Sequence, residues 1–242
     1  MGNLSRRKLL VSGVAGAAGL AAASRLAEQY GLLPPDIGGI YGAGHALTYA
    51  SQRLLTGQTL AREFAPEQIS KAPFAKLRPF QIDAYDRMKA GGFVDWRLEV
   101  GGMVGRPASL SLADLRGLRS RTQITQLACE EGWSYIAEWT GVPLAEILHR
   151  VETPAQARYI VYYSIQPRWW ESIDMTDALH PQTLLVYGMN GADLPMGHGG
   201  PLRLSVPRQL GYKSVKFITR LLVTDSLARF KKGSSYSWYA GI

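Results

Sequence analysis

The sequence contains a single cysteine, Cys129, and this scarcity excludes several kinds of site. A disulfide within the chain needs a second cysteine, and a zinc site built only from protein ligands needs His and Cys pairs at short spacing, which are missing. The haem-attachment pattern Cys-x-x-Cys-His is missing as well. If the chain carries out redox chemistry, we therefore expect its electrons to come from or go to a separate protein.

The chain also lacks any block of five or more consecutive basic residues, although its formal net charge is +8 at pH 7. A basic balance suits nucleic acid, a membrane surface or an anionic small molecule. The basic residues gather in an early group and a late group, which are Arg6, Arg7 and Lys8, then Arg203, Arg208, Lys213, Lys216 and Arg220. The aromatic residues in the sequence around the late group are expected to point into the core and not onto the basic face. This argues against nucleic acid as the partner.

The N-terminus has no long hydrophobic run. A short basic segment, Arg6-Arg7-Lys8, precedes Val11–Ala23, which is uncharged and rich in Ala and Gly. That run is short for a membrane span, whereas a twin arginine before a mild apolar core is typical of a Tat export signal. Ala21-Ala22-Ala23 fits the small-residue cleavage rule and places the mature start near Ser24. We therefore expect a twin-arginine signal segment over residues 1–23 that forms a leader helix, either cleaved or retained as a membrane anchor, and a periplasmic protein. The alternative is a buried Ala/Gly helix with an incidental arginine pair.

Turn residues such as Pro34-Pro35 and Gly38-Gly39 predict an extended lead-in over residues 24–75, with one short helix at Leu47–Leu55. Residues 76–242 predict a single domain. Its expected strands are Trp96–Val100, Thr122–Leu127, Ala157–Ser164, Arg168–Met175, Thr183–Tyr187, Leu202–Val206 and Ser214–Val223. Its expected helices are a capped one that ends at Leu118, one over Val142–Leu148 and one that begins at Thr176. Because strands and helices do not alternate regularly, we predict a mixed-sheet α+β domain.

The cysteine lies in a polar segment, Gln126–Ser134, directly before Glu130 and Glu131. A thiol must lose its proton to act as a nucleophile or a metal ligand. The neighbouring carboxylates raise the pKa of the thiol, which argues against a protease-type nucleophile and favours a highly charged metal centre. For the cysteine taken alone, the alternative is a buried thiol in the core.

A second polar segment runs from His198 to Lys216. Its glycines let backbone N–H groups approach an anion, and Arg203 can bind a phosphate through two parallel hydrogen bonds. If Ser214–Arg220 is a strand, its polar and cationic residues share one face and its apolar residues the other. The segment predicts a site for a phosphorylated, anionic cofactor, with a solvated basic strand face as the alternative.

Together, these two segments resemble the molybdopterin-binding domain of the sulfite oxidase family. The similar motifs are Cys129-x-Glu131-x-Trp133-Ser134, His198-Gly-x-Pro201-x-Arg203 and Gly211-Tyr212-Lys213-x-x-Lys216. The similarity spans Asp95 to Ile242 and is greatest to the bacterial periplasmic branch that contains methionine sulfoxide reductase catalytic subunits. It implies that residues 76–242 adopt the molybdopterin-binding fold of that family.

The resemblance implies that Cys129 binds molybdenum through its sulfur, beside the dithiolene of one pyranopterin. It also implies that Glu131 and Trp133 flank the substrate side of the metal. The residues that it assigns to the cofactor are Ser164, His198, Arg203, Ser214, Val215 and Lys216.

The sequence departs from the family pattern in three respects. Ala128 stands where the branch commonly has arginine, and the arginine set that gathers an oxyanion in sulfite oxidases is not found around Cys129. In addition, the chain ends at Ile242, where an immunoglobulin-like dimerisation domain usually follows. These departures favour reduction of an S-oxide or N-oxide over oxidation of sulfite.

We therefore expect an exported molybdenum-pterin oxidoreductase that transfers an oxygen atom. Its expected partners are a small-molecule substrate and a separate electron-transfer protein, such as a membrane haem or quinone-linked subunit, with no nucleic acid. The alternatives are a sulfite-oxidising enzyme of the same fold and a non-catalytic, basic, exported binding module.

Overall fold

The computed structural model describes residues 34, 42–75, 83–230, 238–239 and 241. The chain divides into two compact units, Met1–Leu55 and Thr56–Ile242. Helix α2 (Gly42–Thr56) accounts for nearly all of the described part of the first unit and contains the predicted helix Leu47–Leu55. The expected signal segment over residues 1–23 lies outside the described residues. Within the described ranges, no helix has both the length and the apolar character needed to cross a membrane.

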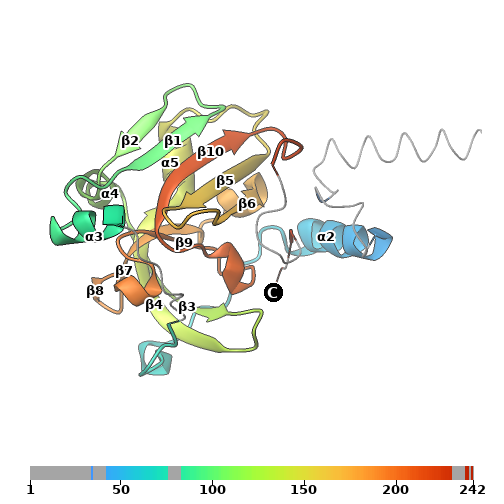
Figure 1. The fold of residues 1–242 in the computed structure, drawn as a ribbon. Coiled ribbons are helices and arrows are strands. Elements are labelled where there is room, and N and C mark those ends of the chain that lie inside the picture. Colours follow the sequence, from blue (N-terminus) through green and yellow to red (C-terminus); the bar gives the residue numbers. More distant parts are fainter. Residues whose placement is uncertain (1–33, 35–41, 76–82, 231–237, 240, 242) are drawn as a thin grey trace, which may run out of the picture. The chain divides into compact units, whose positions relative to one another are not determined.

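The second unit contains two five-stranded sheets, of which the first has the order β2-β1-β10-β5-β6 (Figure 1). Its strands are β1 (Leu98–Gly102), β2 (Ala108–Leu110), β5 (Tyr159–Ser164), β6 (Trp170–Asp174) and β10 (Ile218–Thr224). The pairing of β1 with β10 is parallel, and the other pairs are antiparallel. The sheet therefore joins the first and last strands of the domain.

The second sheet follows the order β3-β4-β7-β8, and β9 also pairs with β7. Its strands are β3 (Arg121–Ala128), β4 (Ser134–Pro143), β7 (Leu184–Met189), β8 (Ala192–Asp193) and β9 (Arg203–Ser205). The β3–β4 hairpin ends with the pair Ala128 and Ser134, so the intervening residues 129–133 form its loop. The single cysteine therefore lies at the tip of a hairpin.

Short helices join the strands in the described part of the second unit. The α-helices are α3 (Asp83–Ala90), α4 (Leu112–Gly117), α5 (Leu144–Arg150) and α6 (Met175–Ala178), and the 3-10 turns are η1 (Pro66–Gln68), η2 (Met196–His198) and η3 (Gly211–Lys213). Helix α4 begins with the predicted capping box, in which Ser111 Oγ accepts from Asp114 N at 3.1 Å and Asp114 accepts from Ser111 N at 2.8 Å. The predicted mixed α+β fold is confirmed.

Strand β7 is buried on both of its faces. Leu185 belongs to the main core, which both sheets share, whereas its neighbours Leu184 and Val186 belong to a second apolar cluster. Successive side chains of a strand point to opposite faces, which explains this division. The second cluster includes Tyr135 and Trp139 of β4, and Trp133 packs against it. The apolar packing therefore continues to the loop that carries the cysteine.

Two predictions about local structure are wrong. The helix predicted over Val142–Leu148 begins only at Leu144, because Val142 and Pro143 complete β4 by pairing with β7. The strand predicted over Ser214–Val223 begins only at Ile218, because the preceding Phe217 has a φ of 57°. The residues before Ile218 are therefore not arranged on two alternating strand faces as predicted.

Lys213, in the η3 turn, is fully buried and forms an ion pair with Glu171. Its Nζ lies 2.9 Å from Glu171 Oε2 and donates to Ser172 O at 2.9 Å. In addition, Tyr162 Oη donates to Lys213 O at 2.9 Å. These contacts attach η3 to β5 and β6, so Lys213 has a structural position rather than one facing a ligand.

Replacing Lys213 with methionine should be strongly destabilising, because Glu171 would then be buried without its cation. We expect a loss of about 3–5 kcal/mol in the free energy of unfolding, measured by urea denaturation. The control is Arg106→Ala, whose ion pair with Glu152 at 3.0 Å is solvent-exposed. That change should cost less than about 1 kcal/mol. Equal losses in the two variants would contradict this assignment.

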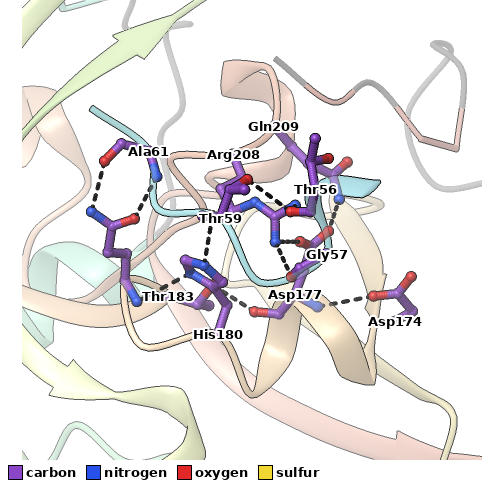
Figure 2. Close-up of polar contacts among 11 residues, drawn as sticks. Thr56, Gly57, Thr59, Ala61, Asp174, Asp177, His180, Thr183, Arg208 and Gln209 are labelled. Carbon is purple, nitrogen blue, oxygen red and sulfur yellow. Dashed lines mark hydrogen bonds and ion pairs between the residues drawn. The ribbon is translucent and has the colours of Figure 1, made fainter. Parts of the chain in front are cut away.

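A buried polar network lies where residues 56–61 pass over the segment 174–183 (Figure 2). His180 Nδ1 accepts from Gln182 N at 3.3 Å, and His180 Nε2 lies 3.1 Å from Thr59 O. This geometry requires a neutral ring that is protonated at Nε2. Burial lowers the pKa of His180, and Arg208 and Arg121 lower it further, whereas its bond to Thr59 and the charge of Asp177 oppose the shift.

The neutral state of His180 predicts a pH-dependent stability. The unfolded chain binds a proton at His180 near the ordinary pKa of 6.5, whereas the folded chain binds it only at lower pH. Stability should therefore fall as the pH drops below about 6.5, by up to about 1.4 kcal/mol per pH unit for this group. In His180→Gln, which keeps a donor for Thr59, urea denaturation between pH 7 and about pH 5 should give a shallower slope. An unchanged slope would show that His180 does not contribute.

Candidate active site

A cleft of about 140 Å³, partly open to solvent, lies between the β3–β4 hairpin loop and the segment 211–217. The predicted site residues that line it are Cys129, Glu131, Trp133, Arg203, Ser214, Val215 and Lys216. The fold thus brings together both polar segments recognised in the sequence. The two segments approach closely at Gly211, where a Cβ would lie 3.2 Å from Ala128 O and 3.0 Å from Leu127 Cδ2, so these neighbours would have to shift by a few tenths of an ångström.

The cysteine loop is held by its own backbone. Cys129 N donates to Trp133 O at 2.9 Å, and Gly132 N donates to Cys129 O at 3.1 Å. Gly132 has a φ of 90°, a conformation that favours glycine. Trp133 Nε1 also donates to Glu131 Oε2 at 3.0 Å. The loop therefore presents the thiol, one carboxylate and one indole ring in a fixed arrangement at the cleft.

The Cys129 thiol is half-buried, and its pKa is raised to about 11, first by burial. Cys129 Sγ donates to Glu130 Oε2 at 3.3 Å, and this bond together with the charges of Glu130 and Glu131 adds to the shift, while a backbone bond from Glu131 opposes it. The thiol is therefore protonated at neutral pH. Only a strong positive charge near the sulfur, such as a metal ion, would produce the thiolate.

Arg203 lies buried in the floor of the cleft, and most of its N–H groups bind the protein. Its guanidinium donates to His198 O at 2.9 Å, Ser214 O at 2.8 Å and Leu204 O at 3.4 Å. A guanidinium has five N–H donors, so these bonds leave two for a ligand. The bidentate phosphate contact expected for Arg203 stays a prediction.

The charge of Arg203 is nevertheless uncompensated. Among the described residues, Arg203 forms no ion pair with a carboxylate. Its guanidinium carbon instead lies 5.0 Å from the ring centroid of Trp139, within the range of a cation–π contact. A buried cation of this kind favours an anionic group nearby. Arg203 thus holds two backbone segments of the site and makes the cleft electropositive.

Lys216 is the second cation of the cleft. Its Nζ donates to Gly197 O at 2.6 Å. The pKa of Lys216 is lowered to about 7, first by burial and then by Arg203, while the charge of Cys129 opposes the shift. An anion bound here would favour the charged form of the lysine.

The structure places His198 and Ser164 behind the cleft rather than on its surface. His198 is buried, with Nδ1 3.2 Å from the Tyr135 hydroxyl, and its pKa is lowered to about 4 by burial and by Arg203 and Lys216. Ser164 Oγ accepts from the backbone N–H of Gln166, at 3.1 Å, and Gln166 lines the cleft. Both predicted cofactor residues therefore reach the cleft only through a neighbour.

Several cleft residues were not predicted from the sequence. These are Phe74, Leu127, Glu130, Tyr135, Gln166, Tyr212 and Phe217. The alternation of Tyr135, Ala137 and Trp139 is a strand signal that indicates Tyr135 in retrospect. Phe74 has no such signal, because its place depends on the path of the preceding segment.

Among the described residues, no group of three or more His, Cys, Asp or Glu side chains could hold a metal ion.

Gly199 should be intolerant of a side chain for two separable reasons. Its φ is 105°, and a Cβ at this position would lie 2.7 Å from Lys216 Cβ. Gly191 also has a positive φ, 76°, but a Cβ there would meet no atom within 4 Å. Gly191→Ala should therefore cost about 1 kcal/mol from backbone strain alone, whereas Gly199→Ala should cost clearly more because Lys216 must move. Overlapping urea denaturation curves for the two variants would refute a steric role for Gly199.

Comparisons with known proteins agree with this geometry. The family model described as "Oxidoreductase molybdopterin binding domain" matches residues 87–229. A putative protein-methionine-sulfoxide reductase subunit YedZ1 from Azospira oryzae is 38% identical over 168 residues, covering 68% of this chain and 64% of the relative. The catalytic subunit MsrP of a protein-methionine-sulfoxide reductase from Xanthomonas axonopodis pv. citri is also 38% identical, covering 61% of this chain and 52% of the relative. The chain thus spans between half and two thirds of the length of these two relatives.

A solved structure supports the fold. The sulfane dehydrogenase SoxCD from Paracoccus pantotrophus superposes with a TM-score of 0.52 at 24% identity, covering 55% of this chain and 39% of that chain. This likeness concerns the fold alone. The family model includes Cys129, Arg203 and Lys216, and it matches more than half of the sequence. The chain therefore belongs to the family of oxidoreductase molybdopterin-binding domains.

Proposed function

We propose that this protein is a molybdenum-pterin oxidoreductase that removes an oxygen atom from an S-oxide or N-oxide, with Cys129 as the protein ligand of the metal. The observation that carries the proposal is the position of Cys129 at a cleft that Arg203 and Lys216 also line. Relatives from Xanthomonas are named as catalytic subunits of protein-methionine-sulfoxide reductases, which supports S-oxide reduction in particular.

The donor set of the cleft fits one pyranopterin that holds molybdenum. The Cys129 thiol needs a strong positive charge to become a ligand, and a molybdenum ion provides one. Arg203, in contrast, needs a negative charge nearby, because its buried cation lacks a carboxylate partner among the described residues. The phosphate of a pterin would supply that charge. The cleft therefore combines a thiol that a metal ion could bind with a buried positive charge that suits an anionic pterin.

The proposed contacts divide between direct and supporting ones. Ser214, Val215 and Lys216 line the cleft and would contact the anionic pterin through backbone and side-chain groups. Arg203 would supply charge and hold the carbonyls of His198 and Ser214. His198 and Ser164 would support this wall from behind, through Tyr135 and Gln166 respectively.

When bound, the molybdenum centre supplies two-electron oxygen-atom transfer chemistry. The protein's own task is then to bind and orient the substrate in front of Cys129. Trp133 and Trp169 provide apolar lining, which suits the carbon substituents of a sulfoxide. The carboxylate of Glu131 is fixed by its bond to Trp133 and stands beside the path of the substrate.

The charges of the cleft favour a neutral substrate over sulfite. Glu130 and Glu131 both line the cleft on the cysteine side, where they would repel an oxyanion. Arg203 uses three of its five donors on backbone carbonyl groups, so it offers fewer donors to an oxyanion than an arginine cluster does. Sulfite oxidation is therefore the less favoured reaction of the same fold. A non-catalytic binding module is less favoured as well, since it does not explain membership of an oxidoreductase family.

The proposal includes a periplasmic location and a separate electron donor. The twin-arginine segment supports export by the Tat pathway, with the leader either cleaved or retained as an anchor. The relatives are named as subunits, which supports a partner such as a membrane haem or quinone-linked protein.

Molybdenum content tests the proposal directly. The wild-type protein, purified from cells supplied with molybdate, should contain molybdenum by mass spectrometry and release a fluorescent pterin on denaturation. Cys129→Ser should lower sulfoxide-dependent oxidation of a reduced viologen by more than about 100-fold, the upper end for changes around a metal site. Glu131→Gln is the matched control in the same loop and should change turnover while the metal stays bound.

Three outcomes would contradict parts of the proposal. A metal-free wild-type protein without pterin would refute the cofactor, and full turnover in Cys129→Ser would refute its role as ligand. Reduction of an artificial acceptor by sulfite, without any sulfoxide turnover, would reverse the assigned direction.

A further inference from the structure

Residues 56–75 form a largely irregular segment, here called the strap. It begins at the buried polar network (Figure 2) and ends near Phe74, which lines the cleft. Only the short η1 turn interrupts it, so side chains and strand edges of the domain supply much of its hydrogen bonding. The strap lies outside residues 87–229, which match the family model. Any residue that the strap brings to the cleft is therefore additional to the cleft residues within the matched range 87–229.

The start of the strap is bound through its backbone carbonyls by buried side chains. Arg208 donates to Thr56 O and to Gly57 O, both at 2.6 Å (Figure 2). Arg208 in turn lies 3.8 Å from the buried carboxylate of Asp177. The next carbonyl contact is that of Thr59 with His180. Contacts with the backbone hold the path of the chain whatever its side chains are.

The side-chain amide of Gln182 pairs with the backbone of the strap in the way that a neighbouring strand would. It is fully buried, its Oε1 accepts from Ala61 N at 2.7 Å, and its Nε2 donates to Ala61 O at 3.0 Å and to Glu63 Oε1 at 3.0 Å. An amide side chain that satisfies both backbone groups of one residue defines that residue's position and orientation.

The middle of the strap crosses the hairpin that carries the cysteine. Phe64 N donates to Ile124 O of β3 at 2.9 Å, and Ser70 N donates to Ile136 O of β4 at 2.9 Å. Ile136 N donates in return to Ser70 Oγ at 3.0 Å. The strap therefore contacts both strands of the hairpin, whose tip is the Cys129 loop.

The end of the strap brings Phe74 to the cleft. The Phe74 ring lies 4.9 Å from the Trp133 ring, and Trp133 stacks on Tyr135 at 6.1 Å with an interplanar angle of 4°. All three residues line the cleft, and Phe74 is 52% exposed. The strap thus extends the aromatic wall of the cleft by one ring that remains available for contact.

We infer that Phe74 is a substrate-positioning residue, held by the strap, that favours sulfoxides with an aromatic or bulky apolar substituent. The inference rests on the proposed function and adds a specificity determinant to it. An aromatic ring offers an apolar face and favourable contacts with sulfur. A small sulfoxide such as dimethyl sulfoxide offers this ring no aromatic or bulky group to contact, whereas a larger substituent does.

The test compares Phe74→Ala with Leu60→Ala in the molybdenum-loaded protein. Leu60 lies on the same strap, is 60% exposed and does not line the cleft, so it is a matched control. For methyl p-tolyl sulfoxide, Phe74→Ala should raise KM by about 3- to 10-fold, with kcat changed by less than about 2-fold. The KM for dimethyl sulfoxide should stay within about 2-fold, and Leu60→Ala should change neither value.

A second variant tests the strap itself. Gln182→Met removes the amide bonds to Ala61 and Glu63 with little change in volume. Amide hydrogen exchange over residues 59–64 should become faster, and KM for methyl p-tolyl sulfoxide should rise in the same direction as in Phe74→Ala, at unchanged molybdenum content. Faster exchange without any change in KM would show that the strap does not position the substrate.

Direct binding separates failure of this inference from failure of the proposed function. Methyl p-tolyl sulfone cannot be reduced in the same way, and its Kd can be measured by titration calorimetry. Phe74→Ala should raise this Kd by about 3- to 10-fold even if the wild-type protein proves inactive toward sulfoxides. Equal Kd values in wild type and Phe74→Ala, or equal losses in Leu60→Ala, would overturn the role of Phe74.

Discussion

The site depends on one buried cation, the guanidinium of Arg203. It binds the carbonyl groups of His198 and Ser214, which belong to two different turns of the cleft wall. Because a buried charge is costly unless hydrogen bonds compensate it, the two turns and the arginine stabilise one another. The same bonds leave the positive charge without a carboxylate among the described residues. One side chain therefore shapes the wall and sets the sign of its potential.

Lys213 and Lys216 show how the surroundings assign different roles to the same residue type. Lys213 is fully buried and neutralised by Glu171, so its charge is used within the fold. Lys216 lines the cleft, and burial there lowers its pKa to about 7. The first lysine attaches η3 to the sheet, and the second faces the space where an anionic ligand fits. The late group of basic residues is thus not one solvated surface.

Much of the site could be predicted from the sequence because its chemistry is carried by rare residues in short motifs. Cys129, Arg203 and Lys216 were identified in this way, and the structure brings them to one cleft. Strand β4 was not predicted, although its buried residues Tyr135, Ala137 and Trp139 alternate along the sequence. The early start predicted for β10 was wrong because Phe217 adopts a positive φ, which sequence periodicity does not indicate. Phe74 could not be predicted, since its place depends on distant contacts such as those of Gln182.

The tight loop that carries Cys129 has a consequence for how a cofactor would enter. The loop closes the β3–β4 hairpin through backbone bonds between Cys129 and its neighbours, and the strap crosses both strands. The conformational entropy that ordering Cys129 costs is therefore lost when the hairpin folds. Insertion of the cofactor then costs little further entropy. A chain built in this way can complete its folding before it meets the cofactor. Its metal ligand is preorganised rather than recruited by the metal.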